Sequence, residues 1–235
     1  MTRSDSSPED APITLEIDGC RVTARHHELL IDVAARLGIA IPTLCHHPDL
    51  APGGACRLCL VELARGKRSK LVTACDFPVE DGMVIRTDSE PVLRHRRMIV
   101  ETLLARCPKP QVLRDLAARL GVAGARFPAG DDTCILCGLC TRVCETHATS
   151  AISTLNRGDA RRVGAYSDEP PEDCVGCGAC AEICPTGHIA ATRGPGTYEI
   201  WGREFAVATC AVDADRCRGC EIGRASCRER VCHRV

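Results

Sequence analysis

The stretch that decides the fold runs from Cys174 to Pro185 and reads Cys-Val-Gly-Cys-Gly-Ala-Cys-Ala-Glu-Ile-Cys-Pro. Its cysteines have the spacing C-x2-C-x2-C-x3-C-P. In this spacing three close thiolates wrap one [4Fe-4S] cube, and the fourth binds a neighbouring cube. The same spacing runs from Cys134 to Cys144, with Glu145 in place of the proline. This internal repeat predicts a domain with two clusters.

The exchange of the fourth ligand divides these eight cysteines into two sets. We expect one [4Fe-4S] cluster to be bound by Cys134, Cys137, Cys140 and Cys184, and its partner by Cys174, Cys177, Cys180 and Cys144. Gly138, Gly176 and Gly178 lie between ligands, where the backbone has to approach a cube closely. A domain of about 60 residues buries little surface, so the clusters are expected to stabilise it.

Four cysteines nearer the N-terminus have the spacing C-x10-C-x2-C-x15-C, and they are Cys45, Cys56, Cys59 and Cys75. Thiolates are soft ligands that suit iron or zinc, and a [2Fe-2S] cluster takes four of them. Gly53 and Gly54 would let the loop approach the sulfides. The alternative is structural zinc, because Cys56-x2-Cys59 is a zinc-knuckle spacing. The ten-residue loop with two glycines is unusual for zinc, so the sequence favours [2Fe-2S].

The residues around this site predict a β-grasp fold. Alternating apolar residues indicate strands over 13–17 and 21–24, joined by a turn at Asp18-Gly19. Apolar residues at helical spacing follow and stop at Gly38; they are Leu29, Leu30, Val33, Ala34 and Leu37. Further strands are expected over 60–63, 71–75 and 83–86.

The pattern then becomes helical, in two segments that we expect to pack as a connector. The first segment places Met98, Ile99, Thr102 and Leu103 on one face, and the second has Val112, Leu113, Leu116 and Leu120 between Pro110 and Gly121. Cys107 is expected to be a small residue at a helix end rather than a ligand. Cys20 is expected to pack as a small hydrophobic residue.

The C-terminal region begins another motif that does not continue. Cys210 leads to Cys217-x2-Cys220, but the next cysteines, Cys227 and Cys232, have spacings that fit no cube. Residues 221–231 resemble the conceptual translation of a sequencing adapter, so we expect 221–235 to be non-native. The alternative is a genuine zinc or cluster site that uses Cys217, Cys220, Cys227 and Cys232.

The sequence therefore predicts an α+β chain with a β-grasp [2Fe-2S] domain and a bacterial-type two-cluster ferredoxin domain. The expected segments are a disordered tail at 1–12, the β-grasp domain at 13–90, the helical connector at 91–129, the two-cluster domain at 130–192, an incomplete ferredoxin-like segment at 193–220 and the non-native tail at 221–235.

Composition narrows the classes of function. The net charge is −1 with no basic block, so nucleic acid is a poor partner. No 18-residue apolar stretch and no export signal occur, so we expect a cytoplasmic protein without a transmembrane segment. The 19 cysteines are then thiols or metal ligands rather than a disulfide scaffold. The sequence has no dinucleotide fingerprint, Walker loop or legible catalytic set, which predicts no active site of its own.

Specific runs resemble a known family. They are Cys45-His46-His47-Pro48-Asp49-Leu50, Cys56-Arg57-Leu58-Cys59-Leu60-Val61-Glu62 and Thr73-Ala74-Cys75, followed by Pro78-Val79 and Gly82-Met83. They resemble the N-terminal domain of the large iron-sulfur subunit of respiratory complex I and of the small diaphorase subunit of bidirectional NAD-linked hydrogenases. The resemblance covers about residues 13 to 192. Those relatives usually carry a further His-x3-Cys-x2-Cys-x5-Cys cluster site, whereas here Cys107-Pro108 stands alone.

The resemblance implies an electron-transfer subunit with one [2Fe-2S] and two [4Fe-4S] clusters. Its expected partners are a flavin subunit that handles NAD(P)H and a catalytic oxidoreductase such as a hydrogenase or formate dehydrogenase. The alternative is an iron-sulfur sensor or scaffold, but no output domain is legible. His46 and His47 follow a ligand, where they either tune the cluster through a hydrogen bond or lie in solvent.

Overall fold

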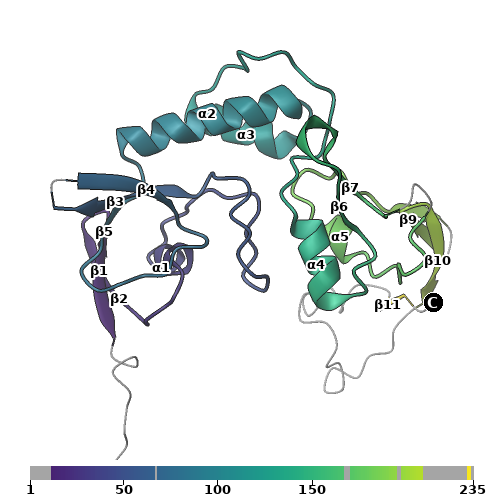
Figure 1. Cartoon of the computed structure of the whole chain (residues 1–235), viewed down its shortest axis with the longest axis horizontal. Helices are drawn as coiled ribbons and strands as arrows, with labels where there is room; N and C mark the ends of the chain where they lie inside the picture. The colour runs from purple at the N-terminus through teal and green to yellow at the C-terminus, as the bar shows by residue number, and fades with distance from the viewer. Residues whose placement is uncertain (1–11, 67, 167–169, 195–196, 209–231, 234–235) are drawn as a thin grey trace, which may run out of the picture. The chain divides into compact units, whose positions relative to one another are not determined.

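The computed structural model describes residues 12–66, 68–166, 170–194, 197–208 and 232–233 (Figure 1). The chain divides into two compact units. The first comprises residues 1–46 and 52–135, and the second comprises residues 47–51 and 136–235. The fold class is α+β, which confirms the prediction.

The first unit is built on a five-stranded mixed sheet. Its strands are β1 (Ile13–Ile17), β2 (Cys20–Ala24), β3 (Leu60–Arg65), β4 (Arg68–Thr73) and β5 (Val84–Arg86). Their order in the sheet is β2-β1-β5-β3-β4. β1 and β5 run parallel and the other pairs are antiparallel, which is the predicted β-grasp arrangement. β4 ends before Cys75, so the fourth cysteine of the first set lies just beyond the strand rather than within it.

The first hairpin is closed by the turn that the sequence predicted. Asp18 and Gly19 have φ values of 49° and 82°, as a two-residue type I′ turn requires. The Asp18 carboxylate also accepts hydrogen bonds from the Thr87 N–H at 2.7 Å and the Thr87 hydroxyl at 2.6 Å. This turn therefore also fixes the chain that leaves β5.

Helix α1 (Leu30–Arg36) packs its apolar face into the core of this unit. Leu30, Val33 and Ala34 are fully buried, together with Ile17 of β1 and Val61 of β3. The helix is followed by Gly38, whose φ of 75° suits glycine at a helix C-terminus. The same core contains Cys59 and Cys75, so the apolar packing of the sheet directly positions two of the predicted ligands.

Helices α2 (Glu90–Arg106) and α3 (Gln111–Leu120) lie side by side within the first unit (Figure 1). The predicted buried face of α2 was wrong, because Met98 is 48% exposed and Thr102 is also exposed. The buried face instead contains Val92, Arg96 and Val100. A buried arginine interrupts the apolar periodicity, so the pattern of hydrophobic residues points to the wrong side of the helix.

Arg96 explains why that face is buried. Its guanidinium donates hydrogen bonds to the carbonyl oxygens of Leu58 at 3.0 Å and Leu60 at 2.6 Å. These two residues flank Cys59. Helix α2 is therefore attached through a charged side chain to the loop that carries the predicted ligands.

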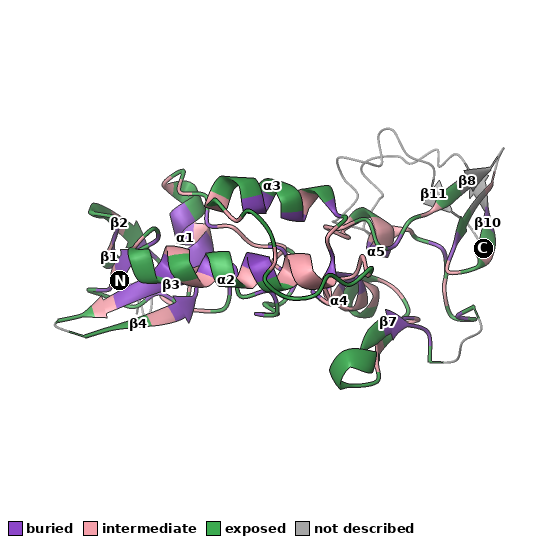
Figure 2. Ribbon diagram, turned by 90° about the horizontal axis from the view of Figure 1, so that it is seen from above, coloured by how far each residue is buried: buried purple, intermediate pink, exposed green. Residues whose placement is uncertain are grey.

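Helix α3 follows the prediction more closely, with Leu113 and Leu116 buried and Gly121 in a left-handed conformation at its end. Figure 2 shows both buried and exposed residues along α3. Cys107 is buried and caps α2, which confirms its place at a helix end. Cys20 is exposed, so the expectation that it packs as a hydrophobic residue was wrong. As the first residue of β2, beside the turn, it lies at the edge of the sheet.

The second unit repeats one local structure at its two cysteine motifs. Helices α4 (Leu139–His147) and α5 (Ala179–Glu182) both begin after a glycine with φ near 70°, at 73° for Gly138 and 72° for Gly178. Each glycine lies between the second and third cysteines of its motif, where its left-handed conformation turns the loop into the helix. Between the motifs lie β6 (Ser153–Leu155), η2 (Gly158–Ala160) and β7 (Arg162–Gly164).

After the second motif the chain forms β8 (Thr192–Gly194), β9 (Thr197–Ile200) and β10 (Arg203–Ala208), and β10 also pairs with β11 (Cys232–His233). Trp201 and Gly202, with φ values of 56° and 71°, form the two-residue turn between β9 and β10. Cys210, Cys217, Cys220 and Cys227 lie outside the described residues. Among the described residues, no helix is long and apolar enough to cross a membrane.

Replacing Arg96 should destabilise the first unit. Arg96→Met keeps most of the buried volume but leaves the carbonyls of Leu58 and Leu60 without their charged donor, at a cost of about 3 kcal/mol. Thermal unfolding followed by the visible absorbance of the [2Fe-2S] cluster would measure the loss. Arg94→Met, an exposed change on the same helix, should leave the midpoint unchanged, and equal midpoints for both variants would contradict this role of Arg96.

Candidate iron-sulfur sites

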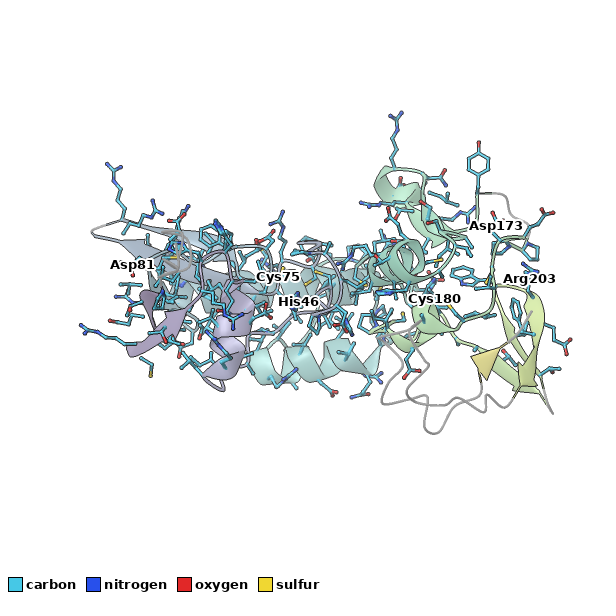
Figure 3. All side chains as sticks on the ribbon, turned by 90° about the horizontal axis from the view of Figure 1, so that it is seen from below. His46, Cys75, Asp81, Asp173, Cys180 and Arg203 are labelled. Atoms are coloured by element: carbon cyan, nitrogen blue, oxygen red, sulfur yellow. The ribbon has the colours of Figure 1, made fainter. Side chains whose placement is uncertain are left out.

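The first candidate site gathers the four N-terminal cysteines of the predicted set. Cys45, Cys56 and Cys59 lie on the loop between α1 and β3, and Cys75 follows β4. Their exposed fractions are 1%, 8%, 0% and 0%, respectively. Figure 3 labels Cys75 within this unit. Four buried thiols supplied by a loop and a strand end are the donor set that a [2Fe-2S] cluster uses.

Backbone N–H groups point at these sulfurs. The Cys56 N–H donates to Cys45 Sγ at 3.3 Å, and the Leu44 N–H donates to Cys56 Sγ at 3.3 Å. Such donors stabilise negative charge on thiolate sulfur and are one way in which proteins set cluster potentials. The loop therefore directs backbone donors at the sulfurs of Cys45 and Cys56.

The thiols of this site also contact one another, and their pKa values reflect it. The hydrogen bond with Cys45 raises the pKa of Cys56 far above its ordinary value, and burial adds to the rise. The contact with Cys45 lowers the pKa of Cys75, but the contact with Cys59 and burial together bring it to about 11. The Cys75 thiol lowers the pKa of Cys59. Four thiols thus share protons whose place iron can take.

Two neighbours shape the electrostatics of the loop. Burial lowers the pKa of Arg96, and the nearby Cys59 opposes that shift, so a positive guanidinium faces a predicted ligand. Gly54 has a left-handed backbone, with φ of 54°, and a Cβ at this position would lie 2.9 Å from Asp76 Oδ2. The glycine lets the loop pass close to the residue that follows Cys75.

The two histidines after Cys45 face carboxylates. His46 Nε2 lies 3.8 Å from Asp32 Oδ1, with its side chain only 11% exposed. His47 Nδ1 accepts a hydrogen bond from the Asp49 N–H at 3.3 Å and lies 3.6 Å from the Asp49 carboxylate. His46 is therefore not a solvated loop residue, and its contact connects the ligand loop to α1.

The second candidate site is a cavity in the second unit. Four predicted ligands from both motifs line it, together with small and apolar residues: Cys144, Cys174, Cys177, Cys180, Ala148, Thr149, Ala151, Ile152, Val175, Gly178, Ala179, Ile200 and Trp201. Cys144 belongs to the first motif and the other three cysteines belong to the second. These are the same four residues that the exchanged-ligand pattern assigns to one [4Fe-4S] cluster.

One of these sulfurs has a donor that the sequence analysis did not foresee. The Trp201 indole N–H donates to Cys180 Sγ at 3.4 Å. Burial raises the pKa of Cys180 to about 11, and the indole bond opposes that rise. Cys177, in contrast, is exposed. The cavity therefore has one buried, hydrogen-bonded sulfur and one sulfur at the surface.

The remaining predicted set has members in both units. Cys137 and Cys140 are buried in the second unit, whereas Cys134 belongs to the last residues of the first unit. Burial raises the pKa of Cys184, but hydrogen bonds from the backbone of Ile189, Thr186 and His188 and from the Thr186 hydroxyl lower it overall. Cys184 thus lies in a nest of donors suited to a thiolate.

Cys134 is held from its backbone side. Arg106 donates to the Cys134 carbonyl oxygen at 2.9 Å and pairs with Asp132 at 2.6 Å. Asp132 in turn accepts a hydrogen bond from the Cys134 N–H at 2.9 Å. This pair fixes the backbone at the start of the first motif.

Within the described part of the chain, no group of three or more His, Cys, Asp or Glu side chains is arranged to hold a single metal ion. A cluster makes a different demand. In a [4Fe-4S] cube each thiolate binds its own iron, so the ligands do not converge on one point. The cavity lined by four cysteines meets that demand.

The residues missed by the sequence analysis contact the ligand loops directly, from positions distant in the sequence. They are Arg106, Trp201, Arg203 and Phe205. The only hint of these contacts in the sequence was a lone tryptophan shortly after a cluster motif. Its role as a donor to a cysteine becomes visible only with the hairpin that carries it.

The fold and these cysteine sets define an iron-sulfur protein of the ferredoxin class, with a β-grasp site followed by a two-cluster site. Residues 10–90 match the family described as "2Fe-2S iron-sulfur cluster binding domain", and residues 133–188 match the "4Fe-4S dicluster domain". The cofactors are accordingly one [2Fe-2S] and two [4Fe-4S] clusters, which confirms that prediction and decides against zinc at the first site.

The chain is also similar to several curated proteins. The chain is 33% identical over 184 residues to the NADPH-Fe(3+) oxidoreductase subunit alpha of Geobacter sulfurreducens, covering 67% of this chain and 22% of the relative. It is 30% identical over 191 residues to the mitochondrial NADH-ubiquinone oxidoreductase 78 kDa subunit of Candida albicans, covering 69% and 26%. It is 32% identical over 177 residues to the NADP-reducing hydrogenase subunit HndD of Solidesulfovibrio fructosivorans, covering 62% and 30%.

A solved structure is also similar. A chain in the crystal structure of an NAD+-reducing [NiFe]-hydrogenase in the H2-reduced state matches with a TM-score of 0.66 and 27% identity, over 75% of this chain and 86% of that chain. The chain is similar to iron-sulfur subunits of NAD(P)H-linked oxidoreductases and hydrogenases, which confirms the resemblance seen in the sequence. It spans less than a third of the length of the curated relatives named here.

The raised thiol pKa values predict how the cluster-free chain responds to pH. The pKa values of Cys75 and Cys180 lie at about 11, above the 9.0 of an ordinary thiol, so protonation stabilises the fold. This contribution is complete below about pH 9 and is lost as the pH rises through about 11. The thermal midpoint of cluster-free protein should therefore fall across this window.

The cluster-loaded chain is the control for that measurement. Its thiols are already thiolates bound to iron, so this part of the pH dependence should be missing, while lysine and tyrosine contribute equally to both samples. Parallel pH profiles for loaded and cluster-free protein would contradict the assignment.

Proposed function

We propose that this chain relays single electrons through its three clusters between a flavin-containing subunit that reacts with NAD(P)H and a catalytic oxidoreductase subunit such as a hydrogenase or formate dehydrogenase. The observation that carries the proposal is the cavity lined by Cys144 together with Cys174, Cys177 and Cys180. Because each motif lends one ligand to the other cluster, the two cubes are held close together. Closely spaced one-electron centres form a path for electrons.

The ligand assignments are part of this proposal. We assign the [2Fe-2S] cluster to Cys45, Cys56, Cys59 and Cys75, and the two cubes to the exchanged sets of the two motifs. The burial of the first four sulfurs and the N–H donors around Cys184 support these roles. The proposed domains remain those predicted from the sequence, including the incomplete segment at 193–220 and the non-native tail at 221–235.

The proposed partners and compartment follow from the relatives. Their names describe NADH-, NADPH- or NADP-linked oxidoreductases and a hydrogenase, all of which need a nicotinamide site that this sequence does not display. A flavoprotein would convert the two-electron chemistry of the nicotinamide into the one-electron steps that clusters accept. We propose a cytoplasmic assembly, since free thiols and oxygen-sensitive clusters suit a reducing compartment.

The first test asks whether the isolated chain accepts electrons without reacting with NADH. Chain reconstituted without oxygen should bind about ten irons and accept electrons from dithionite, yet it should not oxidise NADH. Adding the proposed flavin-containing partner subunit should start NADH-dependent reduction of the clusters, followed by their visible bleaching and by electron paramagnetic resonance. Rapid NADH oxidation by the isolated chain would overturn the proposed division of labour.

The ligand assignment predicts which clusters are lost together. Cys59→Ser should abolish the [2Fe-2S] signal and leave both cubes, whereas Cys177→Ser should perturb both [4Fe-4S] signals because their fourth ligands are exchanged. Iron content and low-temperature paramagnetic resonance of the reduced variants provide the measurement. Cys20→Ser, at an exposed cysteine outside all three sets, is the matched control and should match the parent. Loss of both cubes in Cys59→Ser would refute the separation of the sites.

A further inference from the structure

The hairpin of β9 and β10, residues 197–208, lies beyond both matched domain families. Three of its side chains nevertheless reach the second cysteine motif: Trp201, Arg203 and Phe205. Figure 3 labels Arg203 and Cys180, both in the second unit. A segment that family membership does not require therefore makes repeated contact with one predicted cluster site.

Two of these contacts fix the ligand loop. The Arg203 guanidinium donates to the carbonyl oxygens of Pro171 at 2.8 Å and Cys174 at 2.9 Å, and also to that of Glu172. The buried Phe205 ring lies against Gly176, where a Cβ would come within 2.5 Å of the ring. The loop between Cys174 and Cys177 is thus held on both its polar and its apolar side.

The third contact reaches a sulfur. Trp201 lines the cavity, and its indole N–H lies 3.4 Å from Cys180 Sγ. The indole nitrogen can only donate a hydrogen bond, and a thiolate sulfur can only accept one. Reduction adds one negative charge to a cluster and its thiolates, so a fixed donor stabilises the reduced state more than the oxidised state.

We propose that Trp201 is a positioning residue that raises the reduction potential of the [4Fe-4S] cluster bound by Cys144, Cys174, Cys177 and Cys180. It does so through its hydrogen bond to Cys180, while the Arg203 and Phe205 contacts hold the hairpin in place. This inference rests on the ligand set given under the proposed function. The hydrogen bond shifts the potential of this cube relative to the other two clusters.

Two variants of Trp201 separate the effect of the N–H donor from the effect of the size of the ring. Trp201→Phe removes the N–H and keeps an aromatic cover, and Trp201→Leu removes both. If the hydrogen bond sets the potential, both variants should lower the reduction potential by the same amount. We expect a shift of about 59 mV for one electron, which raises the ratio of oxidised to reduced cluster about tenfold at the midpoint potential of the parent. If the ring only excludes water, Trp201→Leu alone shifts the potential and the proposal fails.

Redox titration followed by paramagnetic resonance has internal controls in this chain. The other cube and the [2Fe-2S] cluster should keep their potentials in both variants, because Trp201 contacts neither of their proposed ligand sets. An exchangeable proton coupled to the reduced cluster should disappear in Trp201→Phe when spectra in H2O and D2O are compared. Unchanged potentials in a variant that retains all its iron would overturn the inference.

A measurement on the parent chain keeps the inference testable if the variants fold poorly. Trp201 is the sole tryptophan of the sequence. Its emission should be strongly quenched when the adjacent cube is bound and should stay quenched in Cys59→Ser, which lacks only the [2Fe-2S] cluster. Emission should recover in Cys177→Ser. Bright emission from the fully loaded parent would refute the contact, whereas cubes retained at full occupancy in Cys177→Ser would refute the ligand set instead.

Discussion

Thiolate sulfurs packed into one buried site repel one another unless protons or metal ions lie between them, and the fold of this chain is organised by that constraint. At the first site the four sulfurs are removed from water and contact one another. Without iron, the thiols must hold protons to remain buried. With iron, the same geometry becomes a ligand set, so cofactor binding and folding are coupled.

Arginine side chains hold the backbone of all three ligand loops. Arg96 binds the carbonyls beside Cys59, Arg106 binds that of Cys134, and Arg203 binds that of Cys174. In a trans peptide the carbonyl and the following N–H point in opposite directions. Each arginine therefore fixes the orientation of the peptide whose carbonyl it binds, and it adds positive charge near a predicted ligand.

The sequence predicted those features that depend on short-range spacing. The close cysteine spacings within each motif, the Asp18-Gly19 turn, the strand pattern and the end of α3 at Gly121 were legible because each depends on residues within a few positions of one another. The buried face of α2 was not, since Arg96 is buried only because two carbonyls thirty-odd residues earlier accept its hydrogen bonds. The contacts of the β9–β10 hairpin were invisible for the same reason. Its residues lie beyond the motif, and nothing in their local pattern indicates a sulfur as partner.

The fit between Gly176 and the Phe205 ring has a consequence for how the chain can evolve. The ring occupies the space that any side chain at position 176 would need. Alanine at 176 would meet both the Phe205 ring and the strain of a left-handed backbone, since the φ of Gly176 is 66°. Related chains that retain the hairpin with an aromatic residue at position 205 should consequently keep glycine at 176, so that this pair would mark which relatives cover this cube with the same hairpin.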